Sequence, residues 1–266
     1  MKKVFAAAFA LAVETALLVF GVVSCRNERS KNLLDQIMAK GELSIATEGI
    51  WAPWSFHNDK NELTGFDIDV SKEICRRLGL RPKFVEMEWE RIFTSLERKE
   101  CDVAINGVEA TAERTKRFFF TQPYAYDTTA IITRKDNNSI KTFVDLEGRT
   151  SANSLGSTYY EIAESFGAIS ILVDSFDETV KLLLEDRADS TLNSAATIYH
   201  YLRSTPNAQV KVAAVADVDM PIAAVCRRGE ENLSLLAKLN QTLEAMHSDG
   251  TLTEISMKYF EKDITK

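Results

Sequence analysis

The sequence has no net positive charge, only four cysteines and only three histidines, and these shortages exclude several classes of protein. The formal net charge is −7 over 266 residues, so the chain lacks the basic surface of a nucleic-acid-binding protein. Cys75, Cys101 and Cys226 follow the N-terminal segment, and no pair has the spacing of zinc ligands, so we expect no metal site. We interpret them as buried thiols, although the sequence leaves open one disulfide between two of them.

Repeats, low-complexity tracts and linkers rich in proline or glycine are also absent from the sequence. With 45% hydrophobic and 27% charged residues, the composition is that of an ordinary globular protein. The length suits one large domain or two small ones. We therefore expect a globular fold with a conventional core, and no motif in it predicts a cofactor.

The first 25 residues differ from the rest of the chain. Two lysines precede a run from Val4 to Val23 that is apolar except at Glu14 and Thr15, which is the layout of a signal peptide. Residues 22–25 resemble the bacterial lipobox, after whose processing the cysteine carries the lipid. The charge of Glu14 is unfavourable in an apolar segment, so an uncleaved anchor is the alternative. We expect a lipoprotein signal peptide over residues 1–25, lipid attachment at Cys25, and a folded part tethered to a membrane outside the cytoplasm.

Strand and helix patterns alternate twice along the remaining chain, first from Leu43 to Thr133 and again after Asp136. We therefore expect an α/β fold with two lobes, each a mainly parallel sheet flanked by helices. Crossings near residues 127–130 and 217–221 would form two hinge strands. They divide the chain into lobe 1 (26–129 and 219–266) and lobe 2 (130–218). Helix N-termini at the carboxyl ends of the strands would face a shared crevice, where we expect the site.

The stretch from Asp102 to Arg114 predicts a binding place for a carboxylate. Val103 to Ile105 form a predicted buried strand, Gly107 frees the backbone for close approach, and Thr111 is a plausible N-cap of a new helix. Arg114 then lies in the first turn, beside backbone N–H groups and the positive end of the helix dipole. A planar cation at such a place suits a carboxylate, so Gly107 and Arg114 are candidate ligand-binding residues. The alternative is a surface arginine on an ordinary turn.

Two further loops follow predicted strand ends. Residues 47–54 are rich in aromatic residues, glycine and proline, as in a binding loop. Residues 153–158 place small hydroxyl residues and Gly156 at a helix N-terminus, which predicts a second anion site that includes Ser157 and Thr158.

Several short segments occur in order, and at the expected intervals, over nearly everything after Leu33. Together they resemble the extracytoplasmic solute-binding proteins of polar amino-acid ABC transporters (solute-binding protein family 3). No single segment is specific, but the ordered set is strong. The segments are Trp51-Ala52-Pro53-Trp54-Ser55-Phe56, Leu63-Thr64-Gly65-Phe66-Asp67-Ile68-Asp69, Thr111-Ala112-Glu113-Arg114, Gln122-Pro123-Tyr124, Leu155-Gly156-Ser157-Thr158 and Asp249-Gly250-Thr251-Leu252.

The resemblance implies a two-lobed, periplasmic-binding-protein-like (type II) fold whose lobes close like a hinge on a free amino acid. In this family the arginine that matches Arg114 pairs with the ligand α-carboxylate. The residue that matches Thr158 donates to the same carboxylate from the second lobe. Aromatic residues that match Trp51 and Trp89 flank the ligand side chain, although core packing would also explain each tryptophan.

The sequence departs from the family pattern at two positions. The family usually has an aspartate for the ligand ammonium after the strand that matches Ala188 to Leu192, and this chain has the uncharged Ser194 there, which we still expect to contact the ligand. A small residue is commoner where Glu109 stands. Our hypothesis is that Glu109 takes over the ammonium from the opposite lobe, because a zwitterion held by Arg114 alone would leave one charge unpaired. Alternatively, Glu109 is a solvated turn residue, paired to Arg114 itself.

Glu48 lies in the aromatic loop and has two interpretations. It either binds a cationic ligand side chain or only stabilises the conformation of its loop. The ligand class therefore stays open among cystine-like, small polar and basic amino acids.

These features predict a lipid-anchored, monomeric receptor that captures a free amino acid and delivers it to an ABC-transporter permease. The first alternative is an enzyme on the same fold, of the cyclohexadienyl or arogenate dehydratase type, with Glu109 as general acid. We expect no enzyme, because His57, His200 and His247 lie outside the loops assigned to the cleft and no nucleophile–base pair appears. The second alternative, an extracytoplasmic amino-acid sensor, would need a membrane span after the fold, whereas the chain ends at Lys266 with charged and polar residues.

Overall fold

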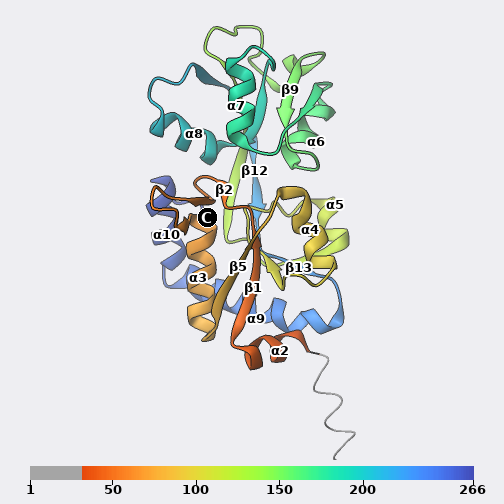
Figure 1. Cartoon of the computed structure of the whole chain (residues 1–266), viewed down its shortest axis with the longest axis vertical. Helices are drawn as coiled ribbons and strands as arrows, with labels where there is room; N and C mark the ends of the chain where they lie inside the picture. Colours follow the sequence, from red (N-terminus) through yellow and green to blue (C-terminus); the bar gives the residue numbers. More distant parts are fainter. Residues whose placement is uncertain (1–31) are drawn as a thin grey trace, which may run out of the picture.

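The computed structural model describes residues 32–266, which form two lobes joined by two long strands (Figure 1). The expected signal peptide over residues 1–25, with lipid attachment at Cys25, lies outside these residues. Within residues 32–266, no helix is both long and apolar enough to cross a membrane. The predicted fold class, a two-lobed α/β protein with helices flanking its sheets, is confirmed.

A five-stranded sheet forms the centre of the lower lobe in Figure 1, which we call lobe 1. Its strands are, in spatial order, β5 (Arg81–Glu86), β1 (Glu42–Thr47), β6 (Val103–Ala104), β13 (Val225–Arg227) and β7 (Phe118–Phe120). β1 pairs in parallel with β5 and β6, whereas β13 pairs antiparallel with β6 and β7. The predicted parallel order of the first alternation is therefore present, with β13 returning from the end of the chain.

Helices cover both faces of this sheet, because β1 has apolar side chains on both sides. Ile45 packs into the large core with α3, α9 and α10, while the next residue, Ala46, packs on the opposite face with α4. The helices of lobe 1 are α2 (Leu33–Lys40), α3 (Phe66–Leu78), α4 (Trp89–Glu97), α5 (Ala112–Arg117), η2 (Glu230–Asn232), α9 (Leu233–Ser248) and α10 (Thr251–Phe260).

A small antiparallel sheet carries the aromatic loop of lobe 1. It consists of β2 (Ile50–Trp51), β3 (Ser55–His57) and β4 (Leu63–Thr64). Trp54 in its turn is fully buried, with its ring 5.6 Å from that of Phe66 and 5.1 Å from that of Phe260. This aromatic cluster anchors the loop on α3 and α10 and so holds the neighbouring Trp51 in place.

The upper lobe, lobe 2, contains two short sheets. One has the order β11 (Thr191–Ser194), β8 (Ala125–Arg134) and β12 (Val210–Ile222), all antiparallel. The expectation of a mainly parallel sheet in this lobe is therefore wrong, because β8 enters the lobe and β12 leaves it, so the two connecting strands run in opposite directions. The other pairs β9 (Thr150–Asn153) in parallel with β10 (Ile169–Leu172), and a single bridge between Ser151 and Ser190 connects β9 to the segment before β11. The helices are η1 (Phe143–Leu146), α6 (Thr158–Ser165), α7 (Phe176–Leu184) and α8 (Ala195–Ser204).

β8 and β12 are the two connections between the lobes (Figure 1). They pair along most of their length, but the register shifts between Val215 and Asp219, opposite Thr128 and Ala130. Such a bulge bends a strand locally. The expected lobe boundaries at residues 129/130 and 218/219 lie beside this irregular stretch.

One predicted strand is misplaced. The sequence predicted a strand from Ala188 to Leu192, whereas β11 runs from Thr191 to Ser194. Asn193 and Ser194 have low strand propensity, but their backbones pair with Ala130 and Thr129 of β8. Pairing with a neighbouring strand therefore overrides local preference here.

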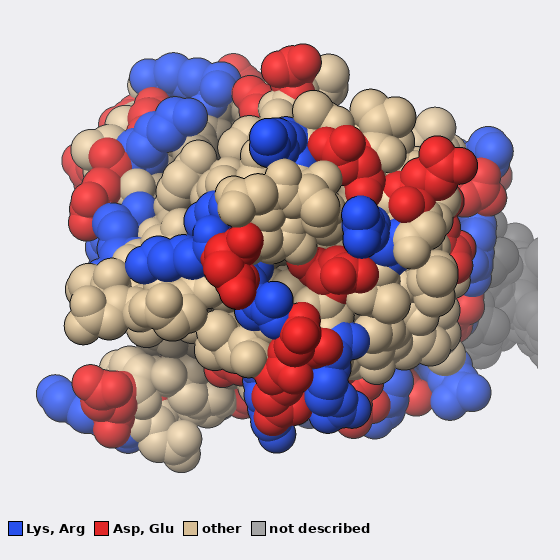
Figure 2. Space-filling view, turned by 90° about the horizontal axis from the view of Figure 1, so that it is seen from above, with Lys and Arg blue, Asp and Glu red and all other residues tan. Residues whose placement is uncertain are grey.

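Figure 2 shows the molecule from above, onto lobe 2, and basic and acidic side chains are interspersed on that face. Lobe 2 contains exposed ion pairs: Arg134 lies 3.0 Å from Asp136, and Arg187 lies 3.2 Å from Glu185. Exposed pairs of this kind contribute only about 0–1 kcal/mol each to stability.

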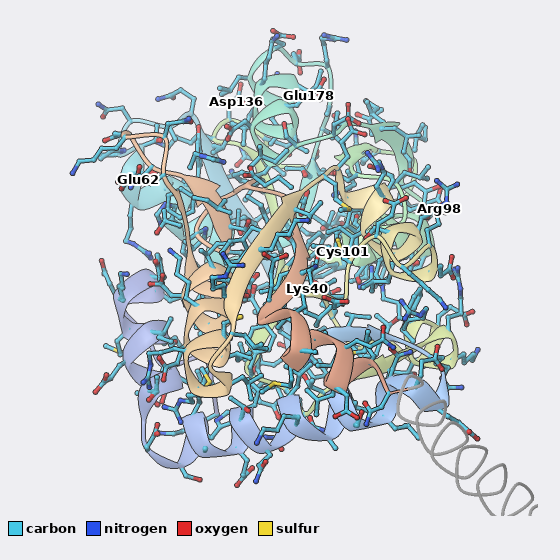
Figure 3. All side chains as sticks on the ribbon, turned by 60° about the horizontal axis from the view of Figure 1, so that its bottom comes forward. Lys40, Glu62, Arg98, Cys101, Asp136 and Glu178 are labelled. Atoms are coloured by element: carbon cyan, nitrogen blue, oxygen red, sulfur yellow. The ribbon has the colours of Figure 1, made fainter. Side chains whose placement is uncertain are left out.

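The three described cysteines are buried and carry free thiols, as the sequence predicted. Figure 3 shows Cys101 among the side chains inside lobe 1, in contrast to Asp136 at the periphery of lobe 2. Burial raises the pKa of Cys75 and of Cys226 to about 12, so these thiols stay protonated and unreactive.

Candidate functional site

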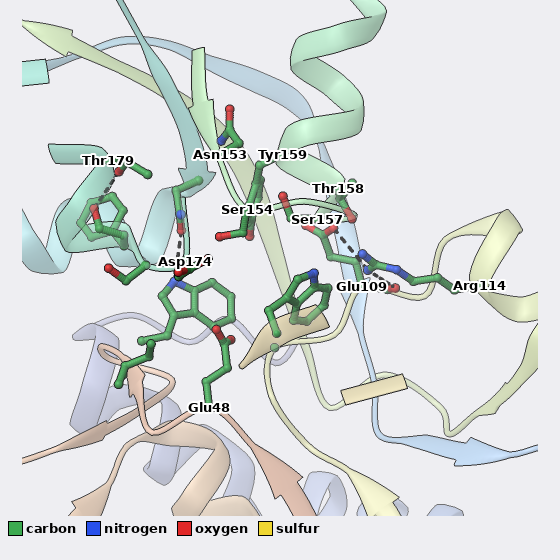
Figure 4. Close-up of a pocket in the computed structure, with 17 residues that line it drawn as sticks. Glu48, Glu109, Arg114, Asn153, Ser154, Ser157, Thr158, Tyr159, Asp174 and Thr179 are labelled. Carbon is green, nitrogen blue, oxygen red and sulfur yellow. Dashed lines mark hydrogen bonds and ion pairs between the residues drawn. The ribbon is translucent and has the colours of Figure 1, made fainter. Parts of the chain in front are cut away.

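A cavity lies between the lobes, where loops follow the carboxyl ends of the lobe 1 strands (Figure 4). The lobe 1 residues that line it come after β1, β5 and β6: Glu48, Ile50, Trp51, Trp89, Gly107, Glu109 and Arg114. The lobe 2 residues come from loops and helix N-termini: Asn153, Ser154, Ser157, Thr158, Tyr159, Asp174, Ser175, Phe176, Thr179 and Asn193. Eight of the nine residues expected to bind ligand therefore lie at this one cavity, and Ser194 does not.

Arg114 is placed by the helix start that the sequence predicted. Thr111 is the N-cap of α5, and its hydroxyl accepts from the Arg114 backbone N–H at 3.2 Å. The guanidinium is not that of a surface arginine, because its side chain is only 11% exposed. It donates to the Glu109 carbonyl and, across the cavity, to the Gly156 carbonyl of lobe 2, both at 3.2 Å. Burial lowers the pKa of Arg114, and the nearby Glu109 carboxylate opposes this shift.

Two aromatic rings support the Arg114 guanidinium. Its central carbon lies 5.1 Å from the ring centre of Trp89 and 5.3 Å from that of Phe93, within the range of cation–π contacts. These rings restrict the guanidinium to one plane while leaving N–H donors for an anion in the cavity. Trp89 therefore lines the cavity and positions the Arg114 guanidinium. Its place is not explained by core packing alone.

Glu109 brings a second buried charge to the same end of the cavity. Its side chain is 7% exposed, and one carboxylate oxygen lies 4.0 Å from Nη1 of Arg114, at the outer limit of an ion pair. Burial raises the pKa of Glu109, while the Thr158 hydroxyl and Arg114 lower it. The interpretation as a solvated turn residue is thus wrong, and the pairing with Arg114 is loose.

Hydroxyl groups of lobe 2 face these charges. Ser157 is the N-cap of α6, and its oxygen accepts from the Tyr160 backbone N–H at 3.1 Å. Thr158 is 7% exposed, and its hydroxyl has no well-aligned hydrogen-bond partner within residues 32–266. This hydroxyl lies beside the Glu109 carboxyl group, whose pKa it lowers, and it is placed to donate to a polar group in the cavity.

Trp51 links the two lobes directly. Its ring stacks on Trp54 at 5.6 Å, and its indole N–H donates to the side-chain oxygen of Asn193 in lobe 2 at 3.1 Å. Gly107 makes room for it: a Cβ there would lie 2.5 Å from the Trp51 ring, and the backbone φ of +55° also favours glycine. The close approach of the Trp51 ring therefore requires glycine at position 107.

Glu48 both braces its loop and lines the cavity. One carboxylate oxygen accepts from the Asn106 side-chain amide at 2.6 Å, and the Glu48 backbone N–H donates back to the Asn106 side-chain oxygen at 2.8 Å. Burial raises the pKa of Glu48 to about 7, against the lowering effect of Asn106. The two interpretations from the sequence are therefore compatible.

Ser194 packs away from the cavity. Its hydroxyl accepts from the indole N–H of Trp54 at 3.2 Å and donates to the Asp127 carboxyl group of β8. Because successive side chains of a strand point to opposite faces, Asn193 of β11 faces the cavity and Ser194 does not. Burial raises the pKa of Asp127 to about 7.

Several lining residues were missed by the sequence reasoning, although two of them carried a signal. Asp174 and Phe176 follow β10 as Ser157 and Thr158 follow β9, so the same strand-end rule would have found them. Asn193 could be found only through its pairing with β8.

The histidines lie elsewhere: His57 contacts Glu86, and His247 contacts the Pro123 carbonyl. Within residues 32–266, no group of histidine, cysteine, aspartate and glutamate side chains could hold a metal ion.

Residues 43–262 match the family model of bacterial extracellular solute-binding proteins, family 3. The chain therefore belongs to this family.

Two relatives extend over nearly the whole chain. The probable amino-acid ABC transporter-binding protein of Haemophilus influenzae is 35% identical over 252 residues, covering 95% of this chain and 97% of the relative. The L-cystine-binding protein TcyA of Bacillus subtilis is 33% identical over 271 residues, covering 100% of both chains. Among solved structures, an ancestral arginine-binding protein bound to arginine matches with a TM-score of 0.78 at 34% identity, covering 83% of this chain and 98% of that one.

Proposed function

We propose that this protein is a lipid-anchored receptor that binds a free amino acid between its lobes and delivers it to an ABC-transporter permease. The observation that carries the proposal is the guanidinium of Arg114, which is buried at the cavity beside an equally buried Glu109. A buried cation and a buried carboxylate in loose contact match the two charged groups of a zwitterion.

Each α-group of the ligand then has a partner. Arg114 binds the α-carboxylate, with the hydroxyls of Thr158 and Ser157 adding hydrogen bonds from lobe 2. Glu109 binds the α-ammonium in place of the aspartate that the family usually has at position 194. The backbone at Gly107 lies beside the bound ligand, and the rings of Trp51 and Trp89 flank it. Ser194 contributes indirectly, by holding Trp54 beneath Trp51.

The names of the relatives support an amino-acid ligand. One relative is named a cystine-binding protein, and one solved structure is bound to arginine. Cystine and arginine both carry an α-carboxylate and an α-ammonium group, and both have flexible side chains that otherwise differ. A common site for these groups is what Arg114 and Glu109 would provide.

Closure of the lobes is the signal to the permease. Among the described residues, Trp51 donates to Asn193 and Arg114 donates to the Gly156 carbonyl across the cavity, and Trp54 donates to Ser194 behind it. A ligand that contacts both lobes favours the closed form by its differential affinity for the two states, and the permease recognises that form. Lobe 1 (26–129 and 219–266) and lobe 2 (130–218) would move as units about β8 and β12.

Lipid attachment at Cys25 would keep this monomeric receptor at the membrane. Replacing Cys25 with alanine should release the protein from the membrane fraction and abolish incorporation of labelled fatty acid. Incorporation at the parent level would overturn the anchoring.

A dehydratase activity is the second candidate, because Glu109 is buried with a raised pKa, as a general acid requires. Within the described residues no histidine lines the cavity to assist it. Incubation with prephenate or arogenate, followed by ultraviolet spectroscopy, should show no new chromophore, and a chromophore would favour the enzyme.

The receptor is tested by a thermal-shift screen of the purified protein against the twenty amino acids and cystine. A ligand at 100 times its Kd stabilises by about 2.7 kcal/mol. The unfolding midpoint should then rise by roughly 2–4 °C for each kcal/mol, confirmed by calorimetric titration. If no amino acid raises the midpoint or gives binding heat, the proposal is wrong.

A further inference from the structure

The charges that line the cavity are unbalanced. Among the described lining residues, three carboxyl groups, of Glu48, Glu109 and Asp174, accompany the single guanidinium of Arg114. The α-carboxylate and α-ammonium of an amino acid cancel each other. A ligand with an uncharged side chain would therefore leave two carboxyl groups of the cavity without a cation.

The two unmatched carboxyl groups come from opposite lobes. Glu48 follows β1 of lobe 1, and Asp174 follows β10 of lobe 2. Figure 4 shows Asp174 and Arg114 far apart, with Ser154 and Tyr159 between them in the view. Asp174 is exposed at the mouth of the cavity, and within residues 32–266 no cation or N–H group pairs with its carboxylate. The free carboxylate is thus separated from the end that would hold the α-groups.

Two other observations indicate that the cavity accommodates a ligand. The hydroxyl of Thr158 is buried at the Arg114 end beside the Glu109 carboxyl group, without a well-aligned hydrogen bond among the described residues, so it can turn to a polar ligand. Aromatic rings from both lobes line the wall and would pack along an extended side chain and attract a cation: Trp51, Trp89, Tyr159 and Phe176.

We infer that the preferred ligand is an amino acid with a cationic side chain, whose cation is received by Asp174 together with Glu48. This inference rests on the proposed function, because it assigns the α-groups to Arg114 and Glu109. A bound cationic amino acid carries one net positive charge into a cavity with an excess of carboxylates, which favours it over neutral ligands. Asp174 is then a specificity-determining residue contributed by lobe 2.

Cystine fits this charge pattern poorly. It carries a second α-carboxylate as well as a second α-ammonium, so its distal carboxylate would also enter the cavity. Beyond Arg114, no cation of the described residues lines the cavity to receive it. The distal carboxylate would meet Glu48 and Asp174, and like charges repel.

Calorimetric titration with L-arginine, L-citrulline, L-lysine and L-cystine tests the inference. Citrulline keeps the shape of arginine but has no side-chain charge, so their affinity ratio isolates the cation. We expect arginine to bind at least about tenfold more tightly than citrulline, as for a charge-assisted hydrogen bond. Lysine should also bind more tightly than cystine.

Two variants locate the effect. Glu48→Gln keeps an acceptor for Asn106 and should reduce the arginine-to-citrulline ratio by roughly tenfold. Asp174→Asn, at the exposed mouth, should reduce the ratio roughly threefold. The control is Asp177→Asn. Asp177 lies in α7, three residues after Asp174, and its side chain is exposed and does not line the cavity. It should leave the ratio unchanged.

The outcomes separate this inference from the proposed function. Equal binding of arginine and citrulline, or tighter binding of cystine than of lysine, would overturn the cationic preference while leaving an amino-acid receptor. A preference for arginine that survives in both Asp174→Asn and Glu48→Gln would overturn the assignment to these carboxylates. Absence of binding by all four ligands and by every other amino acid would overturn both.

Discussion

The two lobes contribute different chemistry to the same cavity. Lobe 1 supplies a guanidinium, the buried Glu109 carboxyl group, the partly buried Glu48 carboxyl group and two tryptophans, on loops that follow the strands of a five-stranded sheet. Lobe 2 supplies mainly hydroxyl and amide groups: Asn153, Ser154, Ser157, Thr158, Thr179 and Asn193. Its one carboxylate at the cavity, Asp174, is exposed at the mouth.

This difference suggests an order of events in capture. The charged groups that match a zwitterion are all present on lobe 1, so an amino acid can bind there before the lobes close. Lobe 2 then adds neutral hydrogen bonds, each of which contributes less than a hydrogen bond to a charged group. We therefore expect substitutions in lobe 1 to reduce affinity more than those in lobe 2.

The largest effect is expected for Arg114→Ala. Removing the guanidinium leaves the buried α-carboxylate without its cation, which costs about 2–5 kcal/mol, or roughly 30- to 4,000-fold in Kd. Calorimetric titration measures the loss. The matched control is Arg117→Ala, in the same helix, whose side chain is 61% exposed and paired with Glu97. Parent-like affinity in Arg114→Ala would refute the role of lobe 1.

Glu109→Gln should have the next largest effect. The amide keeps the shape but cannot neutralise the ligand ammonium, so we expect a loss of about 1.5–3 kcal/mol, or roughly 10- to 150-fold in Kd. Glu113→Gln is the control, because that carboxylate is 71% exposed and pairs with Lys116. Unchanged affinity in Glu109→Gln would show that this carboxylate pairs only with Arg114 and does not bind the ligand ammonium.

A dependence of stability on pH should distinguish the lobes as well. Burial raises the pKa of the Asp67 carboxyl in lobe 1 to about 7, although the Tyr124 hydroxyl donates to it. The folded state then keeps a proton that the unfolded chain releases above about pH 4. The free energy of unfolding should therefore fall as the pH rises from about 4 to 7, and remain low above that.

Asp67→Asn should recover part of this loss at pH 8, with little change at pH 4. The unfolding midpoint would rise by roughly 2–4 °C for each kcal/mol recovered. Tryptophan fluorescence follows lobe 1 specifically, since all three tryptophans of the chain lie there. Asp136→Asn, at an exposed position of lobe 2, should leave the pH dependence unchanged. A variant at position 67 that keeps the full pH dependence would contradict this expectation.

The smallest effect is expected for Thr158→Val in lobe 2. Its hydroxyl offers one neutral hydrogen bond to the ligand, so the expected loss is about 0.5–1.5 kcal/mol, or roughly 2- to 10-fold in Kd. Ser165→Ala at the end of the same helix is the control, because that hydroxyl donates only to the Ile162 carbonyl. A loss as large as that of Arg114→Ala would reverse the ranking of the lobes.

Local patterns predicted much of this arrangement. The predicted helix cap at Thr111 is confirmed. It was predictable because the Thr111 hydroxyl accepts from a backbone N–H only three residues later, which is a local interaction. Helix α4 also follows a local pattern, because its apolar residues Ile92, Phe93 and Leu96 recur at helical spacing and pack on the sheet. The strand near position 192 was misplaced because its pairing with β8 involves residues about 60 positions away in the chain.

The sequence by itself determined the two-lobed α/β class and the loops that carry the charges, since these depend on periodicity, caps and turns within short segments. Only the tertiary structure decided which side chain of each loop reaches the cavity. Asn193 rather than Ser194 faces it, because β11 pairs with β8 in one register. Asp174 joins Arg114 at one cavity because β8 and β12 bring lobe 2 over lobe 1, a contact between segments that no local pattern encodes.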